Sequence, residues 1–252
     1  MLRAERKQQI LDYIVVQKSA QVSDLSDFLN VSLATIRRDL NEMEDDGLVR
    51  RVHGGAISVS SSGEPPVLQR KNEQWEAKRR IGEAAAELVL DGETIIITSG
   101  TTTEAMVPFL AAKKNLTVIT NAINIASSLT RYPDISVIVL GGYLRHSEFS
   151  LVGHLTEQAL QDFRVDKVFH GIFGLDPDYG LTGTDVKEVQ TDRHIILAVP
   201  ELIILADHTK FNRVGQIRLA PIEAVSIVVT DQETSKDPIE ALLAKGIQVI
   251  QA

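Results

Sequence analysis

The sequence predicts an α/β fold class, with a small, mainly helical N-terminal part followed by a larger part in which strands and helices alternate. Three observations lead to this prediction. Amphipathic helical stretches fill the first 46 residues, a Ser-rich stretch follows at 58–66, and short apolar runs then alternate with helical stretches from residue 81 onward. Short apolar strands alternating with helices are typical of a mostly parallel sheet covered on both faces.

Composition narrows the class of protein. The chain has 252 residues, 44% of them hydrophobic, which is enough for two ordinary cores. It contains no cysteine, which excludes disulfides, thiolate metal sites and cysteine nucleophiles and fits a reducing cytoplasm. The sequence has no apolar run long enough to span a bilayer, and its first residues lack the apolar core of a signal peptide. We therefore expect a cytoplasmic protein without membrane contact.

Apolar residues at helical spacing predict the first two helices, over 4–16 and 22–30. Asn30 and Val31 then form a short turn before a third helix. The inward residues are expected to be Ile10, Leu11, Ile14 and Val15 in the first helix and Leu25, Phe28 and Leu29 in the second.

The third helix begins with Ser32 as its N-cap and is expected to end at Gly47, a residue suited to a left-handed C-cap. Ile36, Leu40 and Met43 recur at helical spacing and form its apolar stripe. The opposite face carries small, hydrogen-bonding and guanidinium groups, which is the chemistry that reads guanine edges and binds phosphate. A helix, a short turn and a helix with such a face form the helix-turn-helix pattern of DNA-binding proteins. The expected DNA-facing residues of this helix are Ser32, Ala34, Thr35, Arg37, Arg38 and Asn41.

Residues 48–52 and 56–59 alternate apolar and polar side chains across a Gly-Gly turn, which predicts a β-hairpin and hence a winged helix. We expect Arg50, Arg51 and His53 to approach the DNA, although a charged edge strand that prevents aggregation is the alternative. Three basic residues near the start of the first helix, Arg3, Arg6 and Lys7, either contact the DNA backbone or are only solvated.

Charge limits how such a domain would bind DNA. The net charge is −8, and residues 1–57 hold eight Lys and Arg against nine Asp and Glu. Bulk electrostatic attraction is therefore weak, so affinity must depend on locally focused basic groups, specific contacts and dimerisation.

The second domain is predicted from its strands and helices. Residues 58–66 have linker composition, and 67–80 are expected to begin a connecting helix that carries Trp75. The expected strands are 94–98, 116–120, 135–140, 167–173, 202–206, 224–230 and 248–250, and the expected helices are 81–90, 104–112, 122–130 and 238–245.

Ligands of such sheets bind beyond the carboxyl ends of the strands. Five strand ends here are followed by glycines, hydroxyls, amides or charged groups, which suit a phosphate and sugar hydroxyls. Each group alone also fits ordinary turn or cap chemistry. The expected effector-binding residues are Ser99, Gly100, Thr101, Thr102, Thr103, Asn121, Gly141, Gly142, Arg145, Asp207 and Lys210.

Both halves resemble the DeoR-type family of regulators. The head residues that stand in the order and spacing of its helix-turn-helix signature are Arg6, Ile10, Ile14, Ser32, Thr35, Ile36, Arg37, Arg38, Asp39 and Leu40, and 47–56 look like its wing. Motifs of its sensor domain recur at 97–102, 118–121, 140–142 and 207–211.

The resemblance implies a domain plan and a function. It implies a winged helix-turn-helix over 1–57, a linker over 58–75 and a sensor domain over 76–252 that is similar to ribose-5-phosphate isomerase and glucosamine-6-phosphate deaminase. Such regulators usually repress a sugar-use operon and sense a phosphorylated sugar. By resemblance, the loop Gly100–Thr103 cradles the phosphate and Lys210 pairs with the ligand.

Two other functions remain open from the sequence. A sugar-phosphate isomerase with a DNA-binding head needs a carboxylate base, for which Glu148, Asp176, Glu188 and Asp207 are candidates. A DNA-binding scaffold whose second domain only oligomerises is the third reading. We expect a regulator and not an enzyme, with operator DNA and a phosphorylated sugar as partners, and a homo-oligomer, either dimer or tetramer. The scattered histidines favour no metal site, and we expect no cofactor.

Overall fold

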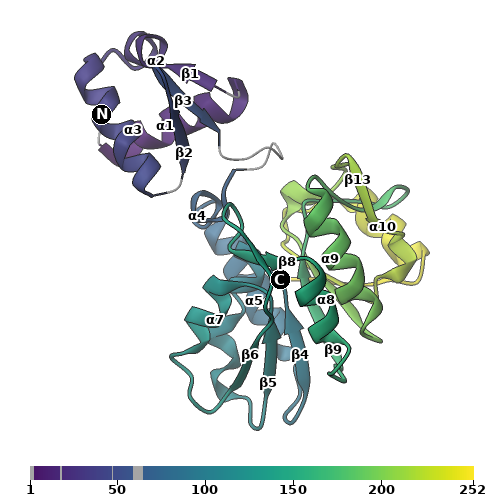
Figure 1. The fold of residues 1–252 in the computed structure, drawn as a ribbon. Helices are drawn as coiled ribbons and strands as arrows, with labels where there is room; N and C mark the ends of the chain where they lie inside the picture. Colours follow the sequence, from purple (N-terminus) through teal and green to yellow (C-terminus); the bar gives the residue numbers. More distant parts are fainter. Residues whose placement is uncertain (1–2, 18, 47, 59–64) are drawn as a thin grey trace. The chain divides into compact units, whose positions relative to one another are not determined.

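The computed structural model describes residues 3–17, 19–46, 48–58 and 65–252, which form two compact units, Met1–Arg70 and Lys71–Ala252 (Figure 1). The expected C-cap Gly47 and residues 59–64 of the expected linker lie outside the described residues. Within the described part of the chain, no helix combines the length and apolarity that a membrane crossing requires.

The first unit is a winged helix-turn-helix. Its antiparallel sheet has the order β1-β3-β2, and the β2–β3 hairpin is the predicted wing. Strand β1 was not expected, because three residues are too few to show an alternating pattern. The elements are α1 (Arg3–Gln17), β1 (Ser19–Gln21), α2 (Val22–Leu29), α3 (Leu33–Asp45), β2 (Val49–Val52), β3 (Gly55–Ser58) and α4 (Val67–Arg70).

One core holds the three helices and the small sheet of this unit together. Ile10 and Ile14 of α1 pack with Ile36, Leu40 and Met43 of α3, and all five side chains are buried. Burying each such side chain contributes about 1.5–3 kcal/mol. Phe28 is an exception, because the structure exposes it beside the ring of Tyr13, and the expectation that it points inward was wrong.

The second unit is built on a seven-stranded sheet with the order β15-β14-β12-β9-β4-β5-β6. Every neighbouring pair in it is parallel, as the apolar runs predicted. From β4 the chain adds strands toward one edge of the sheet, and from β9 it adds strands toward the opposite edge. The topological switch point therefore lies between β4 and β9. The strands are β4 (Thr94–Ile97), β5 (Thr117–Thr120), β6 (Ser136–Val139), β9 (Lys167–Gly171), β12 (Leu202–Leu205), β14 (Ile227–Thr230) and β15 (Gln248–Gln251).

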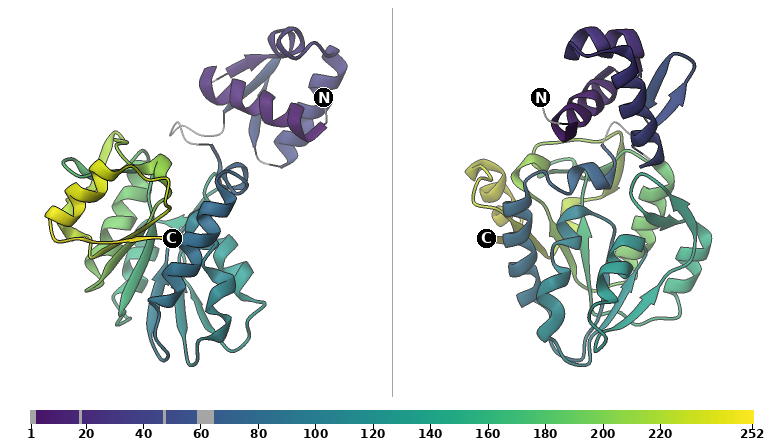
Figure 2. Two further views of the ribbon diagram at one scale, coloured as in Figure 1. Left: turned by 180° about the vertical axis from the view of Figure 1, so that it is seen from behind. Right: turned by 90° about the vertical axis from the view of Figure 1, so that its left-hand side faces the viewer.

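Helices cover both faces of this sheet. Alternate strand residues divide between two cores, with Ile95 and Ile97 on one face and Ile96 on the other. The first face carries α5 (Trp75–Glu87), the 3₁₀ helix η1 (Val107–Ala112) and α7 (Ile123–Leu129). The left-hand view of Figure 2, taken from behind, shows α5 on this face. The second face carries α8 (His154–Leu160), α9 (Val186–Leu197) and α10 (Lys236–Ala244).

Several elements differ from the expectation. The single helix expected over 104–112 is instead α6 (Thr101–Glu104) followed by η1, because Pro108 cannot donate a backbone hydrogen bond. One helix, α5, replaces the break expected near residue 80. The helices α8 and α9 were not expected. The same holds for the hairpin β7 (Tyr143–Arg145) with β8 (Ser150–Val152), and for the small sheet of β10 (Gly174–Asp176), β11 (Gly180–Gly183) and β13 (Ile217–Ala220).

Candidate DNA-binding helix and effector site

Helix α3 presents the predicted DNA-facing residues on its open face. The Ser32 hydroxyl accepts a hydrogen bond from the Thr35 backbone N–H at 3.2 Å, so Ser32 is the predicted N-cap. Ala34, Arg37 and Arg38 are exposed, whereas the apolar stripe of the helix is buried. The face is therefore free to enter a major groove.

A buried ion pair fixes α3 against α1. Asp39 is 1% exposed, and its two carboxylate oxygens accept hydrogen bonds from Arg6 Nε at 2.6 Å and Arg6 Nη2 at 3.2 Å. The hydrogen bond to Asp39 raises the pKa of the Arg6 guanidinium above its ordinary value. A bidentate pair of this kind sets both distance and orientation. Arg6 therefore positions the recognition helix instead of being solvated.

The neighbouring basic residues of α1 also turn toward α3. Arg3 pairs with Glu42, and Lys7 Nζ lies 3.1 Å from Glu42 and 3.5 Å from Asp46. The sequence left open whether these side chains contact DNA or water. The structure shows that acidic groups of α3 hold both of them.

The wing is tied to the recognition helix through Arg51. Its guanidinium donates hydrogen bonds to Asn41 Oδ1 at 3.0 Å and to the Arg37 carbonyl at 3.4 Å, and its backbone N–H donates to Glu44. Arg50 and His53 are exposed on the wing. Of the three predicted wing residues, Arg50 and His53 thus remain candidates for DNA contact, while Arg51 and Asn41 share a hydrogen bond within the protein.

In the second unit, the predicted effector loops share the carboxyl edge of the sheet. The loop Ser99–Thr103 follows β4, the neighbour of the central strand β9, whereas Asn121 follows β5 and Asp207 follows β12. With strands about 4.8 Å apart, the ends of β12 and β6 are roughly 19 Å from each other. A small ligand bound at the loop after β4 can therefore contact the loops of the neighbouring strands more easily than it can contact the loop after β6.

The loop after β4 sits at the topological switch point beside Gly171, the last residue of β9. A Cβ on Gly171 would lie 3.2 Å from the Ser99 carbonyl oxygen and 3.8 Å from Gly100 Cα. Gly100 itself has a φ of +150°, which favours glycine. The stretch that begins at Gly171 is one of the five strand ends singled out in the sequence, but Gly171 was not among the expected effector-binding residues, because only the sheet order brings it beside Gly100.

The threonines of this loop divide into two groups. The Thr103 hydroxyl donates to the Thr98 carbonyl at 2.8 Å and lies 3.0 Å from the Gly100 carbonyl, so it stabilises the loop itself. Thr101 and Thr102 are buried at the start of α6, where the backbone N–H groups of a first turn have no intrahelical acceptor. Those amides are the groups that could receive an anion.

Asn121 places an unused acceptor at the edge of the sheet. Its side chain is 1% exposed, and its Nδ2 donates to the Leu151 carbonyl at 3.2 Å. Within the described residues its Oδ1 has no hydrogen-bond partner. An orphaned buried carbonyl is costly, and a ligand hydroxyl could satisfy it.

Asp207 and Lys210 flank the same edge on the other side. Asp207 is buried and accepts hydrogen bonds from the backbone N–H and hydroxyl of Thr209, so it caps the short helix η2 (His208–Lys210). Lys210 is half-buried in that helix. Asp207 therefore has a structural role as the cap of η2. Lys210 remains the residue of this segment that is expected to pair with a charged group of the ligand.

The remaining predicted residues have structural roles. Arg145 was expected to supply counter-charge, but its guanidinium is surrounded by Glu148, Asp185 and Glu188 at 3.7, 3.6 and 3.0 Å. Three carboxylates around one guanidinium do not attract a phosphate, so this expectation is corrected.

The two glycines after β6 lie beside Thr156 of α8 but differ in how closely they pack. A Cβ on Gly142 would lie 2.4 Å from Thr156 Oγ1, and the Gly141 carbonyl accepts a hydrogen bond from the same hydroxyl at 2.6 Å. Close packing therefore accounts for Gly142, whereas a Cβ on Gly141 would meet no atom within 4 Å, so packing does not explain Gly141.

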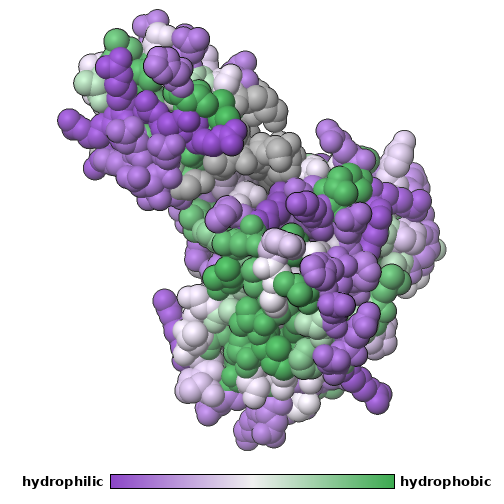
Figure 3. Space-filling view, in the orientation of Figure 1, coloured by the Kyte–Doolittle hydropathy of each residue, from purple (hydrophilic) through white to green (hydrophobic). Residues whose placement is uncertain are grey.

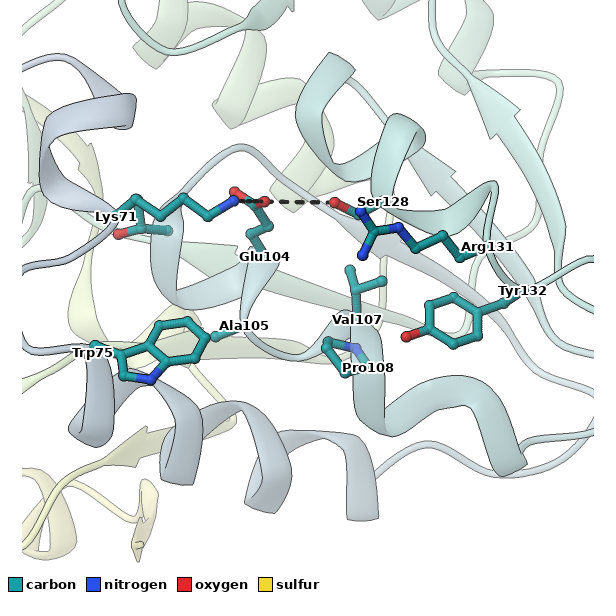
Figure 4. A pocket seen from close by; sticks show the side chains of 10 residues that line it. Lys71, Trp75, Glu104, Ala105, Val107, Pro108, Ser128, Arg131 and Tyr132 are labelled. Atoms are coloured by element: carbon teal, nitrogen blue, oxygen red, sulfur yellow. Dashed lines mark hydrogen bonds and ion pairs between the residues drawn. The ribbon is translucent and has the colours of Figure 1, made fainter.

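A cavity of about 240 Å³ lies beside this edge, on the face covered by α5 and α7 (Figure 4). It shares one residue, Thr101, with the predicted effector loop. Glu104 projects into it and is held by Lys71 at 2.8 Å and by Asn124 at 2.8 Å, while the indole of Trp75 forms another wall. Sequence reasoning missed Lys71 and Glu104, which are 33 residues apart.

One group of side chains could hold a metal ion. His208, Asp231 and Glu233 bring one ligand atom each within 4.8 Å of the others. His208 Nδ1 lies 3.1 Å from Asp231 and 3.3 Å from Glu233, and the Asp231 carboxylate also accepts the backbone N–H groups of His208 and Glu233. These hydrogen bonds account for the cluster as a contact between the loop that follows β12 and the loop that follows β14.

Comparisons with known proteins match both units. The family described as the DeoR-like helix-turn-helix domain matches residues 6–62, and the DeoR C terminal sensor domain matches residues 73–232. The chain is 35% identical to the glycerol-3-phosphate regulon repressor of Escherichia coli (strain K12) over 249 residues, which cover 99% of each chain. It is 31% identical to the putative aga operon transcriptional repressor of Escherichia coli O157:H7, over 98% of this chain and 93% of that one.

Among solved structures, ribose 5 phosphate isomerase A from Neisseria gonorrhoeae aligns with a TM-score of 0.40 at 19% identity, over 53% of this chain and 52% of that chain. The two domain families between them match residues 6–62 and 73–232, and the exposed helix α3 and the parallel sensor sheet are the structures that those families name. The chain belongs to the DeoR family of DNA-binding transcriptional regulators.

Proposed function

We propose that this protein represses a sugar-utilisation operon by binding its operator through α3 and the wing, and that a phosphorylated sugar bound in the sensor domain lowers its affinity for DNA. The observation that carries the proposal is the exposed, basic face of α3, which Asp39 and Arg6 lock into place against the core. Two of the relatives carry the names glycerol-3-phosphate regulon repressor and putative aga operon transcriptional repressor, which supports the same sign of regulation here.

On DNA, Arg37 and Arg38 read base edges, and Ser32 and Thr35 contact the backbone near the start of the helix. Arg50 and His53 extend the contact from the wing. With a net charge of −8 on the chain, one head alone gains little from bulk attraction, so a homo-oligomer bound to an inverted repeat supplies the affinity. The site of action is then the cytoplasm, where the operator lies.

In the sensor domain, the phosphate binds at the first turn of α6, through the backbone amides of Thr101 and Thr102, in the loop that passes close to Gly171. Asn121 Oδ1 accepts a hydrogen bond from a sugar hydroxyl, and Lys210 pairs with the ligand charge from the opposite side. Arg145 and Gly142 are left out of this site, because carboxylates surround the first and close packing against Thr156 explains the second.

The four carboxylates that could act as an isomerase base are engaged elsewhere, which favours sensing over turnover. Glu148 and Glu188 lie against Arg145, Asp176 accepts two backbone N–H groups of its own turn, and Asp207 caps η2. A base must be free to take a proton from the substrate. We therefore propose a binding protein without isomerase activity.

The experiment is a gel-shift titration of the full chain on its upstream intergenic DNA, with and without a panel of ribose 5-phosphate, fructose 6-phosphate and glycerol 3-phosphate. The proposal expects nanomolar binding to one inverted repeat and release by one member of the panel at saturating concentration. Binding with no sequence preference would contradict the operator function. Turnover of an aldose phosphate would contradict the non-enzymatic reading.

A further inference from the structure

The free edge of the sensor sheet carries an apolar surface that no described element covers. Strand β6 is the last strand on its side of the sheet. Val137 and Val139 are 36% and 49% exposed, and the chain continues into exposed Tyr143 and Leu144. Figure 3 shows apolar residues gathered on this part of the sensor domain, where Figure 1 places β5 and β6.

This surface, which we call the β6 surface, comprises the exposed Val137 and Val139 of β6 and the exposed Tyr143 and Leu144 that follow them in the chain. Tyr143 reaches toward α8, because a Cβ on Gly153 would lie 3.3 Å from its ring. The segment 136–144 contains no charged residue and no proline, although proteins usually protect an exposed strand edge with one of these. An unprotected edge with this composition indicates that something covers it.

We propose that the β6 surface is covered by the β6 surface of a second copy of this chain. The chain carries a net charge of −8, so two copies repel each other over most of their surface and approach best through an uncharged segment. The edge offers unpaired backbone N–H and C=O groups, so the occupant must itself present a strand edge. A second copy provides both an edge strand, its own β6, and a segment that is equally free of charged residues.

The side-chain pattern of β6 also fits its own copy. In an antiparallel pair, residues opposite each other point to the same face of the sheet. A two-fold axis through Ile138 therefore sets Val137 of each copy opposite Val139 of the other and joins the two sheets into one. Tyr143 and Leu144 add exposed apolar area beyond the end of the strand.

The inference rests on the proposed function in one respect, because two heads that read an inverted repeat need a two-fold dimer. Its test is independent of DNA and effector. The mass of the full-length chain is measured by sedimentation equilibrium for wild type, Val139→Lys and the control Leu197→Lys. Leu197 is 84% exposed at the end of α9, so the control adds the same charge away from β6.

We expect the wild type to associate at low micromolar concentration and V139K to raise the dissociation constant at least about 30-fold, because it places a charge at the interface centre in each copy. L197K should behave like the wild type. A monomeric wild type at 50 µM or so, or a V139K dimer as tight as the wild type, would overturn the inference.

A second measurement covers the case in which V139K is poorly folded. The chain has no cysteine, so Ile138→Cys introduces one thiol, and on the two-fold axis two such residues have Cα atoms about 4.5–5.5 Å apart. Mild oxidation should give a covalent dimer of I138C, whereas Leu197→Cys should stay monomeric on a denaturing gel. Equal cross-linking of both variants would also overturn the inference. If the masses behave as expected but no sugar phosphate binds, the proposed function fails while the β6 dimer stands.

Discussion

Replacing Arg6 by alanine tests whether the buried pair with Asp39 holds the recognition helix in place. Asp39 is 1% exposed, while the Arg6 side chain is 15% exposed and donates two hydrogen bonds to the Asp39 carboxylate. Removing one partner of a buried pair costs about 3–5 kcal/mol, because the other charge stays buried without compensation. Arg3 Nε lies 4.0 Å from Asp39, which favours the lower end, about 3 kcal/mol.

In a unit of this size, each kcal/mol moves the melting midpoint by about 4–8 °C, so Arg6→Ala should lower the midpoint of the N-terminal unit by roughly 12–24 °C. The assay is differential scanning calorimetry of the full chain, in which the sensor transition serves as an internal reference. Arg79→Ala is the matched control, because Arg79 pairs with Glu76 and Glu83 on an exposed face of α5 and should shift its transition little.

The same variant separates a positioning role from a DNA contact. At a temperature where Arg6→Ala is still folded, the slope of log affinity against log salt should equal that of the wild type, because no phosphate contact has been lost. A slope reduced by about one unit would make Arg6 a backbone contact. A melting midpoint within error of the wild type would refute the clamp altogether.

Three further predictions concern the two sites. Arg38→Ala should weaken operator binding by about 1–3 kcal/mol with no change in melting midpoint, and unchanged affinity in a gel-shift titration would remove α3 from the interface. Trp75 shares a cavity with the effector loop, so its fluorescence should change on saturation with the effector; a silent Trp75 in the presence of calorimetric binding heat would place the coupling elsewhere. Gly171→Ala sets a Cβ 3.2 Å from the Ser99 carbonyl, so effector affinity measured by calorimetry should fall by about 1–3 kcal/mol while operator binding without effector stays the same; an unchanged effector affinity would mean that the ligand lies away from this loop.

The strands and the recognition helix could be predicted from the sequence because their signals are local. All seven strands of the parallel sheet were expected, since each contains a short apolar run such as Leu202–Leu205. The stripe of Ile36, Leu40 and Met43 likewise fixes which face of α3 is buried. A residue pattern with a period of two or 3.6 needs no tertiary information.

What could not be predicted depends on partners far apart in the sequence. Arg6 and Asp39 are 33 residues apart, and neither looks different from a solvated charge until α1 and α3 pack together. Arg145 was expected to meet a phosphate, but the approach of α9 brings Asp185 and Glu188 to it. The position of Gly171 beside Gly100 follows from strand order, which periodicity does not encode.

The coupling between the two domains is the central claim, and isothermal titration of the effector tests it most directly. The sugar phosphate that releases the operator is titrated into the wild type and into Lys210→Ala, each with and without operator DNA. Loss of a charged hydrogen bond worth about 1.5–3 kcal/mol should weaken effector binding roughly tenfold to a hundredfold in the variant. Because coupling is reciprocal, operator should weaken effector binding by the same factor by which effector weakens operator binding. Equal effector affinities with and without operator would contradict the account.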